Sequence, residues 1–205
     1  LKNSSVPEFI AIVILFIALW FCSKENIYSY LSFSLMAIIF LFACLDEGES
    51  IINTLSAITF SALCIYGWLV WRRRNRRGHR IVRISMSSKK EIALQLLVFS
   101  SAFIFLLIAN WIINKNAAFK TIALMAYIVY ATALTGFWLT ANKKLESWYW
   151  YLTSCFAAIF FYYAEHFLIY SFTAIVLMAV VTWCLFAWKK KLNFKRNTTS
   201  HKISA

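Results

Sequence analysis

The chain has 205 residues, of which 62% are hydrophobic and only 14% are charged. Soluble domains are about half apolar and about a quarter charged, and here the apolar residues form long blocks, so an ordinary soluble domain is excluded. The formal net charge of +13 raises the question of nucleic acid, but the basic residues lie between the apolar blocks. The composition therefore predicts a polytopic, all-α integral membrane protein.

Seven apolar blocks are long enough to cross a bilayer as helices. A spanning helix needs about 20 predominantly apolar residues, because each residue rises about 1.5 Å through a hydrocarbon layer about 30 Å thick. The first block only just meets this requirement, and it lies too late, with too little charge before it, to be a signal peptide. In chain order the expected spans are Phe9–Phe21, Tyr30–Leu45, Ile51–Trp71, Ile92–Ile113, Phe119–Ala141, Trp148–Ala164 and Leu168–Trp188.

The basic residues predict how these spans are oriented. All but three of the 21 Lys and Arg residues fall in loops that alternating topology places on one side, the exceptions being Lys2, Lys115 and Lys120. Cytoplasmic loops collect Lys and Arg, so the N-terminus is expected outside and the C-terminus in the cytoplasm. The arginine-rich run at residues 72–77 is expected to meet anionic lipid headgroups rather than nucleic acid.

A repeated pattern divides the spans into two groups. The starts of the second and sixth spans share E-x-x-Y-x-Y-L, beginning at Glu25 and at Glu146, and the third and seventh spans end at Trp71 and Trp188 before basic residues. Interfacial preference alone accounts for recurring aromatics but not for the shared frame. Because one unpaired span separates the two groups, both must run in the same direction. We therefore expect two parallel three-helix repeats joined by a linker helix, a 3+1+3 plan like that of the SWEET sugar carriers.

This plan divides the chain into five segments. They are a first three-helix repeat at 1–71, a basic cytoplasmic loop at 72–90, a linker helix at 91–114, a second three-helix repeat at 115–190 and a basic cytoplasmic tail at 191–205.

Two symmetric halves are expected to hold a substrate site between them, near the middle of the membrane. Aromatic rings with polar tips suit a flat polar or cationic ring, through stacking and cation–π contact, although any one such ring could equally face lipid or pack between helices. The candidate substrate-binding residues are Tyr30, Ser34, Tyr66, Tyr127, Trp138, Trp148, Tyr151 and Cys155, with Ser56 and Thr59 as further polar residues of the third span.

Several kinds of chemistry have no support in the sequence. No ionisable residue lies well inside any span, which argues against proton coupling and, more weakly, against sodium coupling. There is no P-loop, catalytic triad or metal-binding motif, so we expect neither an enzyme nor a metal or other cofactor. The five cysteines have no C-x-x-C spacing and are expected to be small buried apolar residues: Cys22, Cys44, Cys64, Cys155 and Cys184.

Three segments carry a resemblance to a known family. They are K-E-N-I-Y-S-Y at 24–30, Y-G-W-L-V-W at 66–71 and G-F-W-L-T-A-N-K-K-L-E-S-W at 136–148. In order and separation these segments resemble the PnuC family of bacterial vitamin transporters, over nearly the whole chain. The resemblance implies facilitated uptake of nicotinamide riboside by alternating access through the bacterial inner membrane, with a cytosolic kinase trapping the vitamin. A homo-oligomer is compatible with such a small carrier.

The chain also departs from the family pattern. It has Tyr151 where the family often has a second tryptophan, Cys155 where an Asn or Asp is frequent, and Ala57 and Cys64 where a Gln and an Asn occur. Fewer amide side chains suggest a changed substrate, so thiamine or riboflavin stays open beside nicotinamide riboside. A non-transporting scaffold or sensor and a seven-helix receptor are the alternatives from other classes, and neither predicts an internal repeat.

Overall fold

The computed structural model describes residues 6–46, 51–73, 83–113 and 121–203. The described residues form helices and no strand, with one isolated bridge between Ser85 and Lys144, which confirms the all-α expectation. The helices are α1 (Val6–Ser23), α2 (Tyr28–Asp46), α3 (Ile51–Arg72), α4 (Lys89–Ile113), α5 (Thr121–Ala141), α6 (Ser147–Ala164) and α7 (Leu168–Ile203).

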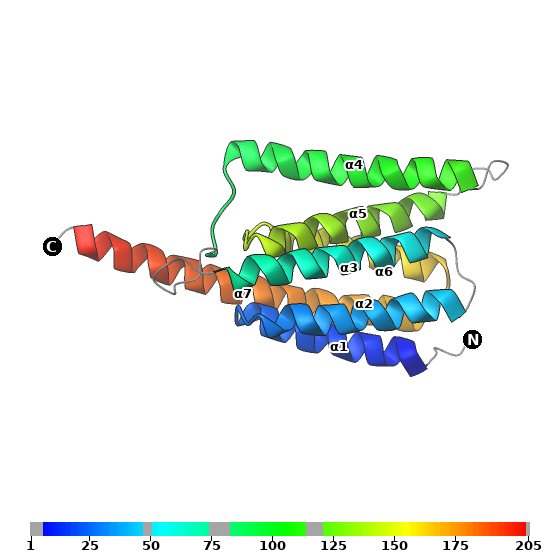
Figure 1. Cartoon of the computed structure of the whole chain (residues 1–205), viewed down its shortest axis with the longest axis horizontal. Helices are drawn as coiled ribbons and strands as arrows, with labels where there is room; N and C mark the ends of the chain where they lie inside the picture. The colour runs from blue at the N-terminus through cyan, green and yellow to red at the C-terminus, as the bar shows by residue number, and fades with distance from the viewer. Residues whose placement is uncertain (1–5, 47–50, 74–82, 114–120, 204–205) are drawn as a thin grey trace.

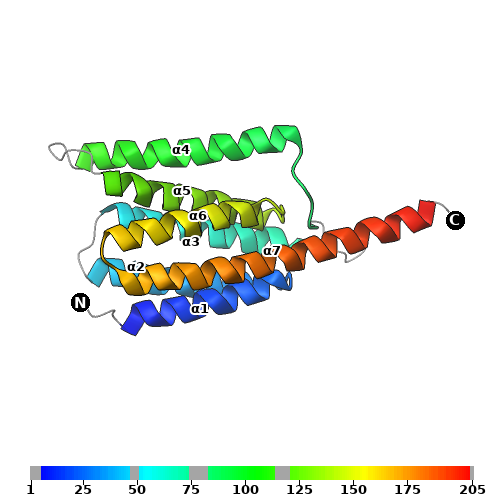
Figure 2. The same ribbon diagram turned by 180° about the vertical axis from the view of Figure 1, so that it is seen from behind.

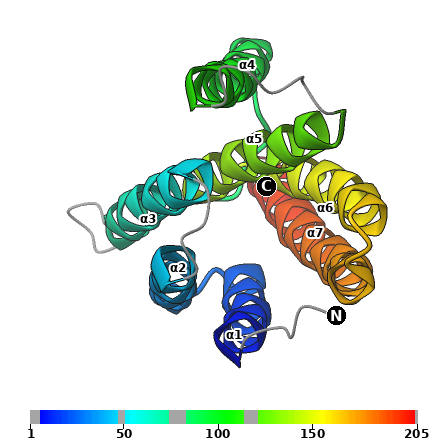
Figure 3. The same ribbon diagram turned by 90° about the vertical axis from the view of Figure 1, so that its right-hand side faces the viewer.

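Six of these helices form a closed ring, and α4 lies outside it (Figure 3). Around the ring the order is α1, α2, α3, α5, α6 and α7, and α7 packs against α1 to close it. Figure 2 shows α7 beside α1 along much of its length. The helices α1–α3 and α5–α7 thus form two three-helix units, and the third helix of each unit packs on the first helix of the other. α4 packs mainly on α5 and only slightly on α3.

The turns and helix ends that carry most of the described basic residues lie at one end of the bundle, at the left of Figure 1, which we call the basic end. There α3 and α5 end, α2, α4 and α6 begin, and α7 continues outward. The described basic residues at this end are Lys24, Arg72, Arg73, Arg83, Lys89, Lys90, Lys143, Lys144, Lys189, Lys190 and Lys191. At the opposite end α1 begins, and the turn from α6 to α7 carries Glu165.

Four helices contain described stretches long and apolar enough to cross a membrane: α3, α4, α5 and α7. α1 and α2 contribute shorter apolar stretches. α6 is rich in Tyr and Trp and begins with several polar side chains, which lowers its hydropathy below that of its neighbours. Large apolar side chains such as Leu97, Phe156 and Phe172 are exposed on the outer surfaces of their helices, as expected of surfaces that face lipid.

The turns that follow α1 and α5 have the same backbone geometry. Glu25 and Lys143 both adopt left-handed φ angles, of 58° and 52°. The Glu25 N–H donates to the Cys22 carbonyl at 3.0 Å, and the Lys143 N–H donates to the Thr140 carbonyl at 3.0 Å. A single left-handed residue ends a helix in this way by reversing the chain direction. Glu25 and Lys143 therefore occupy equivalent positions in the two three-helix units.

The equivalence continues into the next helices, with Ser29 matching Ser147 and Tyr30 matching Trp148, each donating its N–H to the carbonyl three residues earlier. The expected alignment of Glu25 with Glu146 is therefore wrong by three residues. The physical reason for this offset is that Glu146 is the N-cap residue of α6 and binds Ser87, whereas Lys143 holds the left-handed position.

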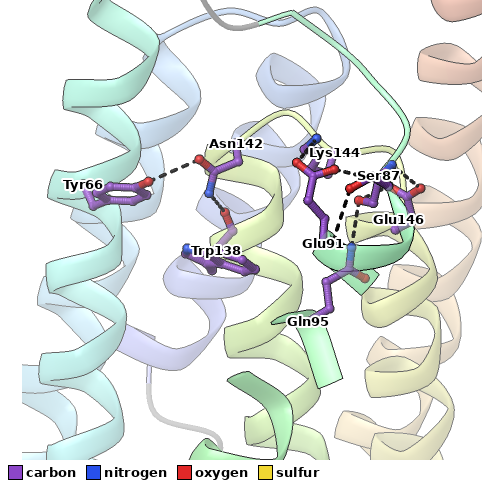
Figure 4. Close-up of polar contacts among 9 residues, drawn as sticks. Tyr66, Ser87, Glu91, Gln95, Trp138, Asn142, Lys144 and Glu146 are labelled. Atoms are coloured by element: carbon purple, nitrogen blue, oxygen red, sulfur yellow. Dashed lines mark hydrogen bonds and ion pairs between the residues drawn. The ribbon is translucent and has the colours of Figure 1, made fainter. Parts of the chain in front are cut away.

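Glu146 fixes the segment that leads into α4 (Figure 4). Its carboxylate accepts hydrogen bonds from the N–H and the hydroxyl of Ser87, at 2.8 and 3.0 Å. Gln95 of α4 donates to the same Ser87 hydroxyl at 2.8 Å and accepts from the indole of Trp150 at 3.1 Å. This network attaches the base of α4 to α6, although α4 stays outside the ring.

α4 begins three residues before the expected span because it has its own cap. The Ser88 N–H donates to the Glu91 carboxylate at 2.7 Å, while the Glu91 N–H donates to the Ser88 hydroxyl at 3.4 Å. This reciprocal arrangement is a capping box, and the sequence S-K-K-E at 88–91 carries its signature.

Candidate functional site

The interior of the ring is filled by aromatic side chains from both three-helix units. We call this set the interior aromatic cluster: Tyr30, Phe33, Trp71, Phe137, Trp148, Tyr151 and Trp188. Its two central members, Tyr30 and Trp148, are completely buried. They occupy equivalent positions at the starts of α2 and α6, so the two units present one ring each to the interior.

The contacts around these two rings are also equivalent. Tyr30 packs edge-to-face on Trp71 with centroids 5.1 Å apart, and Trp148 packs edge-to-face on Trp188 at 5.2 Å. One turn further along its helix, each central ring meets a second aromatic side chain, Phe33 at 6.1 Å and Tyr151 at 5.8 Å. The two units therefore build the interior from the same kind of packing with different side chains.

Trp71 and Trp188 also connect one unit to the other. The Trp71 indole donates to the Ala141 carbonyl at 3.0 Å, and the Trp188 indole donates to the Cys22 carbonyl at 3.1 Å. Each tryptophan belongs to the third helix of its own unit, Trp71 near the end of α3 and Trp188 within α7, and binds the end of the first helix of the other unit.

Among the described residues, five buried side-chain polar atoms have no hydrogen-bond partner, and four of them belong to this interior: Tyr30 Oη, Trp148 Nε1, Ser29 Oγ and Ser147 Oγ. A buried polar group without a partner costs about 1–3 kcal/mol, so such groups are rare without a reason. These four form two matched pairs, one member of each pair from either unit. The two units therefore have hydrogen-bonding groups without a partner at equivalent positions. Groups that bind a ligand are expected to be arranged in this way.

The structure brings four of the predicted site residues together: Tyr30, Trp148 and Cys155 belong to the buried core of the ring, and the partly buried Tyr151 packs against it. Tyr151 Oη lies 3.3 Å from Thr140 Oγ1 in a hydrogen bond. Cys155 follows Tyr151 one turn later and is 5% exposed.

The other four predicted residues lie elsewhere. The Ser34 hydroxyl donates to the Tyr30 carbonyl of its own helix, α2, at 2.8 Å. Tyr66 is partly exposed and donates to the Asn142 side chain at 3.2 Å (Figure 4). Tyr127 packs with Leu106 between α5 and α4. Trp138 lines a separate cleft.

That cleft, of about 480 Å³, lies between α3, α4 and α5, outside the ring. Most of its lining is apolar, with three hydroxyl side chains among the lining residues: Leu55, Ser56, Thr59, Leu63, Val98, Ser101, Ala102, Phe105, Leu106, Leu134 and Trp138. The sequence placed Ser56, Thr59 and Trp138 beside the other candidates because helical spacing does not reveal where the linker helix lies.

Gly67 is a site feature that the sequence analysis did not single out. A Cβ atom at this position would lie 2.0 Å from Cε1 of Tyr30, so the Tyr30 ring packs directly on the backbone of α3. Only glycine permits such an approach. The Y-G-W segment at 66–68, quoted above for the family resemblance, contained this signal.

Lys143 is the clearest correction to the sequence analysis. It was counted only among the basic residues of the cytoplasmic loops, yet its side chain is 1% exposed and pairs with Glu25 at 3.0 Å. The reason is the left-handed turn, which directs this side chain back towards the ring instead of away from it.

Metal and thiol chemistry can be stated for the described residues. No group of three or more His, Cys, Asp or Glu side chains is close enough to hold a metal ion there. Cys22, Cys64, Cys155 and Cys184 are free and buried, as the sequence predicted, and the side chain of Cys44 lies outside the described residues.

Comparison with known proteins agrees with this architecture. The family model described as nicotinamide mononucleotide transporter matches residues 5–190. A crystal structure of the vitamin B3 transporter PnuC superposes with a TM-score of 0.69 at 12% identity, covering 92% of this chain and 83% of that one. A search of curated proteins finds no match. The fold is thus that of a known membrane transporter, and the chain belongs to the nicotinamide mononucleotide transporter family, also known as PnuC.

Proposed function

We propose that this protein carries nicotinamide riboside across the membrane, binding it in the interior aromatic cluster. The observation that carries the proposal is the matched pair of buried donors without a partner, Tyr30 Oη and Trp148 Nε1, among aromatic rings packed edge-to-face. Nicotinamide riboside combines a flat cationic ring with amide and hydroxyl groups. The aromatic faces suit the ring and the two donors suit its polar substituents.

The charges near the cluster favour the riboside over the mononucleotide in the family description. A mononucleotide adds a phosphate, which requires paired cationic side chains when it is buried. Among the described residues the buried set contains one basic side chain, Lys143, whose ammonium already pairs with Glu25. A cationic substrate needs no such group.

Thiamine is the second candidate, because it too carries a cationic aromatic ring. The observation in its favour is the shortage of amide side chains that could recognise a carboxamide. Among the described residues the buried set contains a single amide, Gln95, which is bound to Ser87 and Trp150 near the basic end.

We further propose that α1–α3 and α5–α7 are two repeats that rock against each other during alternating access, with the basic end in the cytoplasm. The equivalent turns and indole hydrogen bonds support the repeat, and the positive-inside rule supports the orientation. The described acidic side chains lie at helix ends or in turns, which fits facilitated movement without proton coupling. Phosphorylation by a cytosolic kinase would then make uptake unidirectional.

The test is a calorimetric titration of the purified protein with nicotinamide riboside, nicotinamide mononucleotide, thiamine and riboflavin, followed by uptake into proteoliposomes. We expect saturable binding and uptake of nicotinamide riboside, and weaker binding of the mononucleotide by about tenfold or more. Preference for thiamine would replace the substrate. Binding of none of the four by folded protein would refute a vitamin carrier.

A further inference from the structure

A buried ion pair joins the two three-helix units at the basic end. The Lys143 ammonium lies 3.0 Å from the Glu25 carboxylate, and the two side chains are 1% and 16% exposed. Both residues occupy the left-handed position of equivalent turns, one in each unit. We propose that this pair is a clasp that holds the carrier closed at the basic end and separates when the carrier opens there. This inference rests on the proposed transport function.

Two more contacts hold the clasp in place. Lys191 of α7 lies 3.4 Å from the other Glu25 oxygen and donates to the Ser23 carbonyl at 3.0 Å. On the other side, the Lys143 ammonium lies 4.5 Å from the centre of the Trp71 ring, a cation–π contact. Four elements therefore meet at this one ion pair. They are the turns after α1 and α5, the end of α3 through Trp71, and α7 through Lys191.

The clasp is physically connected to the interior aromatic cluster. Trp71 lies beneath the Lys143 ammonium and packs edge-to-face on Tyr30 at 5.1 Å. A ligand that moves the Tyr30 ring therefore also moves the aromatic face on which Lys143 rests. Substrate in the interior and the state of the clasp are thus linked through one side chain.

The energetics of a buried ion pair suit a gate. The desolvation of two charges offsets most of their attraction, so an intact pair adds little net stability, and both groups recover water when the basic end opens. Neutralising Glu25 instead leaves the buried Lys143 ammonium without this counter-charge in the closed state, whereas neutralising Lys143 leaves Glu25 paired with Lys191. The Glu25→Gln variant is therefore expected to shift the carrier towards the open state.

The adjacent residue offers a matched control. Lys144 pairs with Glu91 at 2.6 Å, at the same end of the bundle. This pair joins the α5–α6 turn to α4 and does not connect the two three-helix units. Its side chains are 17% and 41% exposed, so they stay solvated in either state.

Cys22 provides the readout, because it is fully buried beside the clasp and its carbonyl receives the N–H of Glu25. With Cys44, Cys64, Cys155 and Cys184 replaced by alanine, Cys22 is the only thiol. The protein is placed in nanodiscs and labelled with a water-soluble maleimide. We expect Glu25→Gln to label about tenfold faster than the unmodified clasp and Lys144→Gln to label at the unmodified rate.

A double variant tests whether the buried charge without its counter-charge is the cause. Glu25→Gln combined with Lys143→Gln removes both charges, so the melting temperature and slow labelling should both return. A Glu25→Gln protein that is folded but labels no faster, or a double variant that still labels fast, overturns the clasp. Vitamin binding is measured on the protein that retains Cys155: its absence there, together with fast labelling of Glu25→Gln, counts against the proposed function and leaves the clasp standing.

Discussion

The two three-helix units place different side chains in the same frame. At equivalent positions the first unit has Tyr30 and Phe33, and the second has Trp148 and Tyr151. Apolar aromatic side chains surround Tyr30, since it packs on Phe33 of its own unit and on Phe137 of α5, in the other unit, at 5.7 Å. The second unit carries more polar groups, including Tyr151 and the thiol of Cys155.

The backbones of the two units are alike, and their interior side chains differ. Both units have equivalent turns and equivalent tryptophan hydrogen bonds to the other unit. The side chains between them have diverged, so a substrate without twofold symmetry meets a predominantly apolar wall on one side and a more polar wall on the other. The predictions below test each part of that comparison.

The largest effect is expected at the glycines beside the two tyrosines. Gly67→Ala places a Cβ atom 2.0 Å from the Tyr30 ring, whereas Gly136→Ala meets the Tyr151 ring at 3.1 Å. Overpacking of this kind costs about 1–3 kcal/mol, and we expect Gly67→Ala at the upper end and Gly136→Ala below about 1 kcal/mol. Thermal unfolding in detergent measures both, and equal losses would show that the Tyr30 contact is not special.

A second comparison concerns the two tyrosine hydroxyls. Tyr151→Phe removes a hydrogen bond with Thr140 and should cost about 1 kcal/mol in the unliganded protein. Tyr30→Phe removes a hydroxyl without a partner, so its unliganded stability should be unchanged or higher. Unfolding measured without vitamin decides this. A marked loss in Tyr30→Phe would mean that its hydroxyl is already bonded.

The smallest difference between the units is expected for the two tryptophans that hydrogen-bond across them. Trp71→Phe and Trp188→Phe each remove one indole hydrogen bond to the other unit while keeping an aromatic ring, at a cost of about 1 kcal/mol each. The same unfolding assay compares them. Losses that differ by more than about 1 kcal/mol would contradict the equivalence of the two units.

The sequence predicted the large-scale architecture because apolar block length and tryptophan position depend only on the membrane. It misaligned the two turns because Glu146 occurs three residues beyond the position equivalent to Glu25, and only backbone hydrogen bonds reveal that offset. It did not predict that Lys143 is buried, because counting charges in loops cannot detect a left-handed turn.

The grouping of the candidate residues was predictable only in part, for a related reason. Tyr30, Trp148, Tyr151 and Cys155 lie together because the starts of α2 and α6 face the interior. Trp138 lies apart from them, because its surroundings depend on α4, whose position outside the ring depends on the hydrogen bonds of Ser87 and Gln95. No helical periodicity in α5 encodes those contacts.

The most direct test of the central claim is to locate the vitamin by calorimetric titration of three variants. Tyr30→Phe and Trp148→Phe each remove one unpartnered donor from the interior, and Trp138→Phe alters the lateral cleft by a similar amount. If the substrate binds between the two units, the first two variants should lose about tenfold in affinity and the third should match the unmodified protein. Unchanged binding in the first two with a loss in Trp138→Phe would place the substrate in the lateral cleft and contradict the account.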